Sequence, residues 1–283
     1  MTESILLITG TSSGIGLASA VAAARAGFTV VATMRDPDRS DALRTAASAA
    51  GVTLDIQPLD VTDPASVAAA VDYAASTYGR LDALLNNAGA GHLGTIELES
   101  VDDVRGVMEV NFFGVVAMTR AAMPLLRASG GRVLTVSSVG GVVGQPFNEA
   151  YCAAKFAVEG FMESLAPVAA TVGVRVSVIE PGAVTTEFVA NVGGRRSVEG
   201  TPYAGALDAY LERTAAAFDP ANAQTPEGVA DVVVEVLTSA NPPARVQTSE
   251  AARRFAGVKL ADLDGAHVQA VTRHWVSPEP SSA

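Results

Sequence analysis

The 283-residue sequence is poor in the features that mark several special classes of protein. It has one cysteine, Cys152, so no disulfide can form within a chain, and this favours a reducing compartment. Its three histidines, His92, His267 and His274, are widely spaced and join no Cys/His cluster, so we expect no metal site. No run of about 18 uncharged apolar residues exists, so we expect no membrane span.

Positive charge is also scarce. Nineteen lysines and arginines stand against thirty acidic residues, which gives a net charge of −11. Such a surface repels phosphate backbones and argues against a nucleic-acid partner. The first residues, Met1 to Ser4, contain no basic leader or transit pattern. We therefore expect a cytoplasmic protein.

Short apolar runs alternate with alanine-rich segments along the first two thirds of the chain. Strands are predicted over residues 4–9, 28–34, 54–59, 83–86, 132–137 and 174–180, and helices over 15–26, 40–50, 64–78, 101–129 and 148–171. The strands are continuous apolar runs, which is typical of burial on both faces. The pattern predicts an α/β, doubly wound Rossmann-type fold with a central parallel sheet flanked by helices on both faces. Ligands of such folds bind beyond the carboxyl ends of the strands.

We find no linker between domains, so residues 1–283 are expected to form a single domain. After residue 180 the alternation weakens, and helices are predicted over 203–218 and 225–239 with a short strand over 245–247. We expect residues 186–220 to form a substrate-binding loop and helix, and residues 249–283 a C-terminal extension. Within the former, Phe188, Val189, Tyr203, Tyr210, Leu211 and Phe218 suggest an apolar pocket, although ordinary helix packing explains the same residues.

The first predicted strand ends in TGTSSGIG, residues 9–16, and leads into a helix. Glycines let the backbone turn tightly, and N–H groups at a helix start can meet the charge of a pyrophosphate. The spacing is G-x-x-x-G-x-G, so a plain strand–helix turn is the alternative. Its place after the first strand favours dinucleotide binding. The candidate residues of this turn are Gly10, Ser12, Ser13, Gly14, Ile15 and Gly16.

The end of the second strand bears on the choice of cofactor. An acidic residue here usually binds the ribose of NAD, whereas an arginine accommodates the 2′-phosphate of NADP. We expect Arg35, assisted by Thr33 or Ser12, to pair with that phosphate, so that NADP(H) is favoured over NAD(H). Asp36 could instead neutralise Arg35 or bind a ribose, and a surface arginine without a ligand is the plain alternative.

Tyr151 and Lys155 are spaced to share one helical face. A phenol titrates near 10, and an adjacent ammonium lowers that pKa, so the pair can supply an acid and a base for carbonyl chemistry. Ser138, thirteen residues before Tyr151, could donate to the same substrate oxygen. Asn111 is an unusual amide in an apolar helix and must find partners if buried; bonding to a neighbouring element would satisfy it.

These motifs occur together with Asp60-Val61, Asn86-Asn87-Ala88-Gly89 and Pro181-Gly182, in an order that resembles the short-chain dehydrogenase/reductase family over about residues 4–190. The resemblance implies that Tyr151 is the proton donor and acceptor, that Ser138 orients the substrate oxygen, and that Asn111 holds a water in the proton relay. Lys155 would hold the nicotinamide ribose and lower the tyrosine pKa. Cofactor contacts are implied at Asp60, Val61, Asn87, Ala88, Gly89, Tyr151, Lys155, Pro181, Gly182, Val184 and Thr186.

Residues 138–160 and 32–36 resemble the 17β-hydroxysteroid and retinol dehydrogenase branch of that family. The branch implies NADP(H) and a bulky hydrophobic ketone, aldehyde or alcohol as substrate. A biosynthetic ketoreductase of a polyketide or other secondary metabolite is the alternative. A non-catalytic dinucleotide-sensing regulator is more remote, because all four candidate catalytic residues are present. Helices 101–129 and 148–171 could form a two-fold interface, so we expect a homo-oligomer, most simply a dimer.

Overall fold

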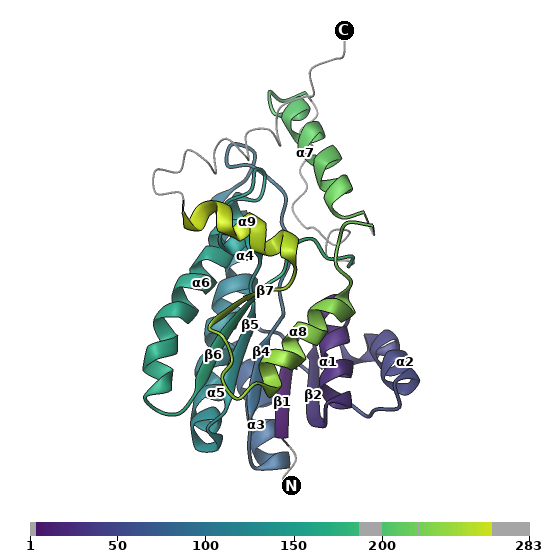
Figure 1. Cartoon of the computed structure of the whole chain (residues 1–283), viewed down its shortest axis with the longest axis vertical. Helices are drawn as coiled ribbons and strands as arrows, with labels where there is room; N and C mark the ends of the chain where they lie inside the picture. Colours follow the sequence, from purple (N-terminus) through teal and green to yellow (C-terminus); the bar gives the residue numbers. More distant parts are fainter. Residues whose placement is uncertain (1–3, 187–199, 220, 262–283) are drawn as a thin grey trace.

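The computed structural model describes residues 4–186, 200–219 and 221–261, and its core is one parallel sheet covered by helices on both sides (Figure 1). Within these residues the strand order is β3-β2-β1-β4-β5-β6-β7, and every neighbouring pair is parallel. The strands are β1 (Ser4–Thr9), β2 (Phe28–Met34), β3 (Asp55–Pro58), β4 (Ala83–Asn86), β5 (Arg132–Val136), β6 (Arg175–Glu180) and β7 (Arg245–Gln247). The predicted doubly wound fold is confirmed. Because the order reverses between β1 and β4, a crevice is expected at their carboxyl ends.

Successive strand residues face opposite helical layers. Leu7 and Leu84 pack into one core with α3 (Pro64–Tyr78), α5 (Gly114–Ser129) and α6 (Glu149–Ala170). Leu6 and Leu85 pack into the other core with α1 (Gly14–Arg25), α2 (Asp41–Ala49) and α8 (Pro226–Thr238). Solvent does not reach these four leucines, and each buried side chain of this size contributes about 1.5–3 kcal/mol. The continuous apolar runs of the sequence follow from this two-sided burial.

The start of α3 agrees with its sequence signals. Asp63 caps the helix, since its Oδ1 accepts a hydrogen bond from Ala65 N at 2.9 Å, and Pro64 occupies the first helical position. The missing N–H of proline costs nothing there.

The segment 101–129, predicted as one helix, is not a continuous α-helix. It is interrupted by a π-helical turn, η2 (Glu109–Phe113), between α4 (Val101–Met108) and α5. Asn111 is at its centre and is fully buried. Just beyond, Gly114 packs so closely on Val61 that a Cβ would lie 2.7 Å from its Cγ2. Wide turns of this kind are frequent at functional sites, and this one brings α5 against the loop that follows β3.

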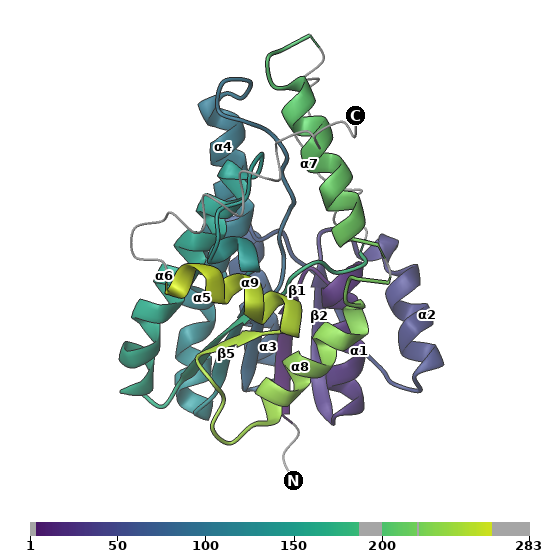
Figure 2. The same ribbon diagram turned by 45° about the horizontal axis from the view of Figure 1, so that its top comes forward.

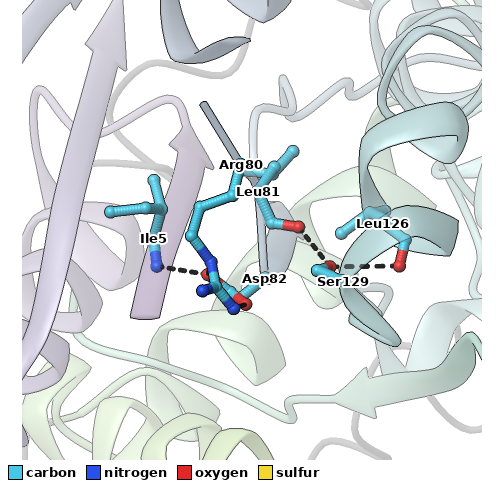
Figure 3. Close-up of polar contacts among 6 residues, drawn as sticks. All are labelled: Ile5, Arg80, Leu81, Asp82, Leu126 and Ser129. Atoms are coloured by element: carbon cyan, nitrogen blue, oxygen red, sulfur yellow. Dashed lines mark hydrogen bonds and ion pairs between the residues drawn. The ribbon is translucent and has the colours of Figure 1, made fainter. Parts of the chain in front are cut away.

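The amino ends of the strands are fastened by side chains (Figure 3). The Asp82 carboxylate accepts from Ile5 N at 2.8 Å and forms an ion pair with Arg80, which joins β4 to β1. Ser129 donates to Leu81 O at 2.6 Å and so ties the end of α5 to the same place. These contacts lie at the opposite end of the sheet from the motifs described below.

The last third of the described chain places α8 beside α1 and two further helices toward the carboxyl end of the sheet (Figure 1). Helix α7 (Ala204–Ala217) extends away from the sheet, and α9 (Glu250–Leu260) lies across its end near α6 (Figures 1 and 2). The predicted helices over 203–218 and 225–239 and the strand over 245–247 are confirmed within a residue. Residues 187–199 of the expected substrate loop and 262–283 of the expected extension lie outside the described part. Among the described residues, no helix has the length and apolar character needed to cross a bilayer.

Candidate active site

The turn between β1 and α1 presents backbone N–H groups at a helix start. Gly10 has a φ of +72° and Gly14 one of +56°, which glycine adopts without strain. Ser13, at the cap position, makes no side-chain capping bond, and the first turn of α1 contains no acidic residue. The first N–H groups of a helix lack partners within it and carry partial positive charge, so this turn is suited to an anion.

One close approach and four hydrogen bonds fix the shape of the turn. A Cβ on Gly16 would lie 2.1 Å from Gly10 O, so only glycine fits there. Asn87 donates from Nδ2 to Thr9 O at 2.9 Å and to Gly10 O at 2.8 Å. Thr9 Oγ1 accepts from the backbone N–H groups of Asn87 and Ala88 at 3.0 and 2.9 Å. Asn87 therefore supports the turn, and the glycine cradle with its N–H groups fits a dinucleotide pyrophosphate.

The sequence analysis gave Thr9 no role of its own. Its hydroxyl is buried and organises the start of the β4 loop. A threonine immediately before the glycine turn is the only signal in the sequence.

Arg35 and Asp60 lie near each other where β2 and β3 end. Thr62 donates to Asp60 Oδ1 from its N at 2.9 Å and its Oγ1 at 2.7 Å, and these bonds lower the pKa of that carboxyl. The Arg35 charge lowers it further, by a smaller amount. Arg35 is exposed. A guanidinium is thus available at the predicted 2′-phosphate position.

Two of the residues near Arg35 are engaged in other hydrogen bonds, and one is exposed. Asp36 Oδ1 accepts from Asp38 N at 3.1 Å and caps the short η1 turn (Pro37–Arg39). Thr33 is fully buried and donates to Ile8 O at 2.8 Å, so its hydroxyl joins β2 to β1 and cannot assist Arg35 as expected. Ser12 is exposed and remains the candidate partner.

Ser138 and Tyr151 come together at the carboxyl end of β5. Ser138 caps the η3 turn (Val139–Gly141) and accepts from Gly140 N at 3.0 Å. Burial raises the pKa of the Tyr151 phenol, while a hydrogen bond with Ser138 lowers it by less. A phenol in this state keeps its proton at neutral pH and can serve as an acid.

Lys155 lies one turn beyond Tyr151 on α6. Its Nζ donates to Val136 O at 3.0 Å and is 5.8 Å from the centroid of the Tyr151 ring. Burial lowers the pKa of Lys155 to about 8, while the charge of Glu159 opposes this change. The pKa of the tyrosine is raised by burial, and the contribution that lowers it comes from Ser138.

Asn111 bonds to its own surroundings, as the plain alternative predicted. Its Nδ2 donates to Ala90 O and to Val107 O, both at 3.0 Å, and its Oδ1 accepts from Ala90 N at 3.2 Å. A Cβ on Gly89 would lie 2.9 Å from Asn111 Oδ1 and 3.7 Å from Lys155 Nζ. Asn111 and Lys155 therefore meet at Gly89; a water between them stays a prediction.

The segment after β6 reaches the same place. Val139 N donates to Pro181 O at 2.9 Å, which sets Pro181 and Gly182 beside the Ser138 turn. Val184 is buried and bridges to Gln224. Thr186 packs against the glycine turn, since its Cγ2 would be 3.2 Å from a Cβ on Gly14. The predicted cofactor-binding residues thus share one end of the sheet, with Ile15 and Val61 partly buried beside the two cores.

An apolar cluster adjoins the start of α6. Phe147 is buried with a φ of +58°, and its ring centroid is 5.7 Å from that of Tyr210 on α7. Asn148 Nδ2 donates to Tyr210 Oη at 2.6 Å. The cluster comprises Leu93, Phe147, Tyr203, Ala206, Leu207, Tyr210 and Leu211. Of the expected pocket residues it contains Tyr203, Tyr210 and Leu211 but not Phe218, while Phe188 and Val189 lie outside the described residues.

Comparisons with known proteins agree with this geometry. A model of the short chain dehydrogenase family matches residues 4–196. The 17-beta-hydroxysteroid dehydrogenase type 1 of Homo sapiens is 40% identical over 302 residues, which cover 100% of this chain and 89% of that protein. Retinol dehydrogenase 8 of Bos taurus is 39% identical over 271 residues, covering 92% and 86%. A substituted actinorhodin polyketide ketoreductase, solved with NADPH, has a TM-score of 0.75 at 27% identity and covers 87% of this chain and 95% of its own.

Proposed function

The chain belongs to the short-chain dehydrogenase family and is an oxidoreductase acting on CH–OH groups, and on that premise we propose that it uses NADP(H) to interconvert a bulky hydrophobic ketone or aldehyde and its alcohol. The observation that carries the proposal is the meeting of Ser138, Tyr151 and Lys155 beside the glycine turn, at the carboxyl end of the sheet. Ligands of doubly wound folds bind there.

Tyr151 is the proton donor of the reduction. Its phenol gives a proton to the carbonyl oxygen and takes one back when an alcohol is oxidised. Ser138 donates to the same oxygen and orients it, and a positioned acid of this kind accelerates such reactions by about 10²–10⁴-fold. A nicotinamide cofactor bound there would supply or accept the hydride.

Lys155 and Asn111 assist the same proton transfer. The Lys155 ammonium holds the nicotinamide ribose and favours charge on the reacting oxygens, because opposite charges stabilise each other at short range. Asn111 fixes the backbone at Ala90 and holds the water through which Lys155 exchanges protons with solvent. The pyrophosphate is held by the first-turn N–H groups at Gly14–Gly16, and the adenine by Asp60 and Val61.

The preference for NADP(H) rests on Arg35. Its guanidinium is exposed at the end of β2 and can pair with a 2′-phosphate together with Ser12. The Asp36 carboxylate is engaged with Asp38 N, which supports this choice over binding of a ribose hydroxyl. The structurally similar polyketide ketoreductase is solved with NADPH, which supports it as well.

A bulky hydrophobic substrate is supported by two observations. The apolar cluster around Phe147 and Tyr210 adjoins the helix that carries Tyr151, so it can bury a large apolar group beside the reacting oxygen. Two relatives near 40% identity are named for a hydroxysteroid and for retinol. A steroid or retinoid is therefore the first substrate class to test.

A biosynthetic ketoreductase is the second candidate. The likeness to the actinorhodin polyketide ketoreductase over 87% of this chain favours it. A dinucleotide-sensing regulator has less support, because a sensor has no need of the complete set Asn111, Ser138, Tyr151 and Lys155.

We also propose that the chain forms a dimer through the helices around η2 and α6. Phe113 and Val168 are large apolar residues on these helices, and 49% and 64% of their surfaces are exposed. Burying such side chains against a second copy is favourable. Light scattering after size exclusion should give twice the chain mass; a monomer at micromolar concentration would contradict the proposal.

The deciding experiment is cofactor oxidation by the purified protein against a steroid ketone, a retinoid aldehyde, an aromatic ketone and a polyketide mimic, with NADPH and with NADH. The proposal expects NADPH-preferring turnover of the steroid or retinoid, and a large loss of that turnover in Tyr151→Phe. Turnover confined to the polyketide mimic would favour the ketoreductase. Tight cofactor binding without turnover of any compound would favour the regulator.

A further inference from the structure

Lys155 and two buried carboxylates lie close together, and the two carboxylates stand behind the site. Lys155 and Glu159 are one turn apart on α6, and Glu180 is the last residue of β6. Only 4%, 6% and 0% of these residues, in that order, are exposed. A buried charge is costly unless an opposite charge or hydrogen bonds compensate it. How these charges are paired therefore bears on the state of Lys155.

Arg245 on β7 joins the two carboxylates. Its Nε lies 2.7 Å from Glu180 Oε1 and 3.4 Å from Glu159 Oε2, and its Nη2 lies 3.0 Å from Glu163 Oε2. Cations and carboxylates thus alternate from Lys155 through Glu159 and Arg245 to Glu180. Glu163, whose side chain is 75% exposed, pairs with Arg245 at the surface.

Glu159 also packs against the backbone that carries Ser138. A Cβ on Gly141, in η3, would lie 3.0 Å from Glu159 Cγ, 3.1 Å from Lys155 O and 2.6 Å from Ser137 Oγ. Burial raises the pKa of Glu159, and the Ser137 hydroxyl, Arg245 and Lys155 each oppose that change. The Glu159 side chain therefore packs on the turn that follows Ser138, while its carboxylate lies beside Arg245.

We propose that Glu159 is a positioning residue of the reaction, whose carboxylate keeps Lys155 in its ammonium form and holds the Ser138 turn in place, with Arg245 fixing that carboxylate. The inference rests on the proposed function, because Glu159 acts through Lys155 and Ser138. It adds a role for β7, which contributes no residue to the predicted site.

The electrostatic part of this role follows from the burial of Lys155. Burial lowers the pKa of Lys155 to about 8, and the Glu159 charge raises it again. The other charged or titratable groups around this row are Tyr151 and Glu163 on α6, Glu180 on β6 and Arg245 on β7. Without the Glu159 carboxylate, Lys155 would lose its proton at a lower pH.

The test is the pH dependence of kcat/KM for ketone reduction in the wild type, Glu159→Gln and Glu163→Gln. In Glu159→Gln the alkaline decline should begin about one pH unit lower, which is roughly a fivefold loss at pH 8 with activity near wild type at pH 6. Glu163→Gln removes a carboxylate from the same arginine at the surface and should reproduce the wild-type profile.

Two results would overturn the inference: a Glu159→Gln profile identical to that of Glu163→Gln, or an equal loss at every pH, which is what a merely structural role produces. If Glu159→Gln does not fold, Glu159→Asp and Arg245→Lys decide. Both keep the charges, and both should retain the wild-type alkaline limb; a downward shift in either would contradict the proposal.

A second readout separates this inference from the proposed function. The dissociation constant of NADPH, followed by fluorescence between pH 6 and pH 9, needs no turnover. Glu159→Gln should weaken binding about fivefold at pH 8 and little at pH 6, because the ammonium is lost earlier. If no ketone is reduced, the proposed function fails, while this shift still supports or overturns the role of Glu159.

Discussion

Lys155 Nζ lies 5.8 Å from the centroid of the Tyr151 ring and donates to the carbonyl oxygen of Val136 at 3.0 Å. Burial moves the two side chains toward their neutral forms, since it raises the pKa of the phenol and lowers that of the ammonium. The phenol therefore carries its proton at neutral pH, as the proton donor of a ketone reduction must.

Tyr151→Phe removes the proton donor and little else. We expect kcat/KM for ketone reduction to fall by about 10²–10⁴-fold, the usual contribution of a positioned acid. The NADPH dissociation constant should stay near wild type, because the phenol ring and the glycine turn remain. Stopped-flow reduction and fluorescence titration measure the two quantities.

Tyr73→Phe is a suitable control, because Tyr73 lies on α3 among core residues away from the site. It should leave kcat/KM unchanged. Substantial turnover by Tyr151→Phe would show that another group donates the proton.

Most of the fold could be predicted from the sequence, because strands buried on both faces must be continuous apolar runs. The glycine turn was legible because Gly16 tolerates no side chain against Gly10 O. The π-helical turn at Asn111 was not, since its residues suit an ordinary helix and only the tertiary partner Ala90 accounts for the wider turn. The pairing of Glu159 with Arg245 was equally hidden, because the two lie 86 positions apart (245 − 159).

Arg35→Ala tests the cofactor preference. Losing a hydrogen bond to a charged group costs about 1.5–3 kcal/mol, so kcat/KM for NADPH should fall by roughly 10- to 150-fold. The value for NADH should hardly change, because NADH has no 2′-phosphate. Arg105→Ala, at an exposed pair with Asp102, is the control for lost surface charge. An equal decline with both cofactors would exclude the 2′-phosphate as the partner of Arg35.

Gly16→Ala tests the shape of the turn. The new Cβ would lie 2.1 Å from Gly10 O and 2.4 Å from Asn87 Nδ2, so the backbone must shift. Forced packing of this kind costs about 1–3 kcal/mol of unfolding free energy, and NADPH binding should weaken as well. Urea denaturation and fluorescence titration measure both effects.

Gly160→Ala makes the same chemical change on the exposed side of α6, where nothing lies within 4 Å of the added Cβ. Alanine is favoured over glycine inside a helix, so this variant should gain about 0.5–1 kcal/mol. If the two variants were equally stable, the close contact at Gly16 would have no energetic weight.

Glu180 should make stability depend on pH in the sense opposite to a surface carboxylate. Burial raises its pKa from 4.5 to about 7, against the opposing hydrogen bond from Gln247. Between these values the folded chain binds more protons than the unfolded chain, so the contribution of Glu180 to stability falls as the pH rises from 4.5 to 7. The full change is up to about 3 kcal/mol.

Glu180→Gln is uncharged at every pH and should resemble the wild type at pH 5 but exceed its stability at pH 8. Urea denaturation at both pH values measures the difference. Parallel behaviour of the two proteins would mean that Arg245 keeps Glu180 charged throughout, and that the pairing outweighs the cost of burial.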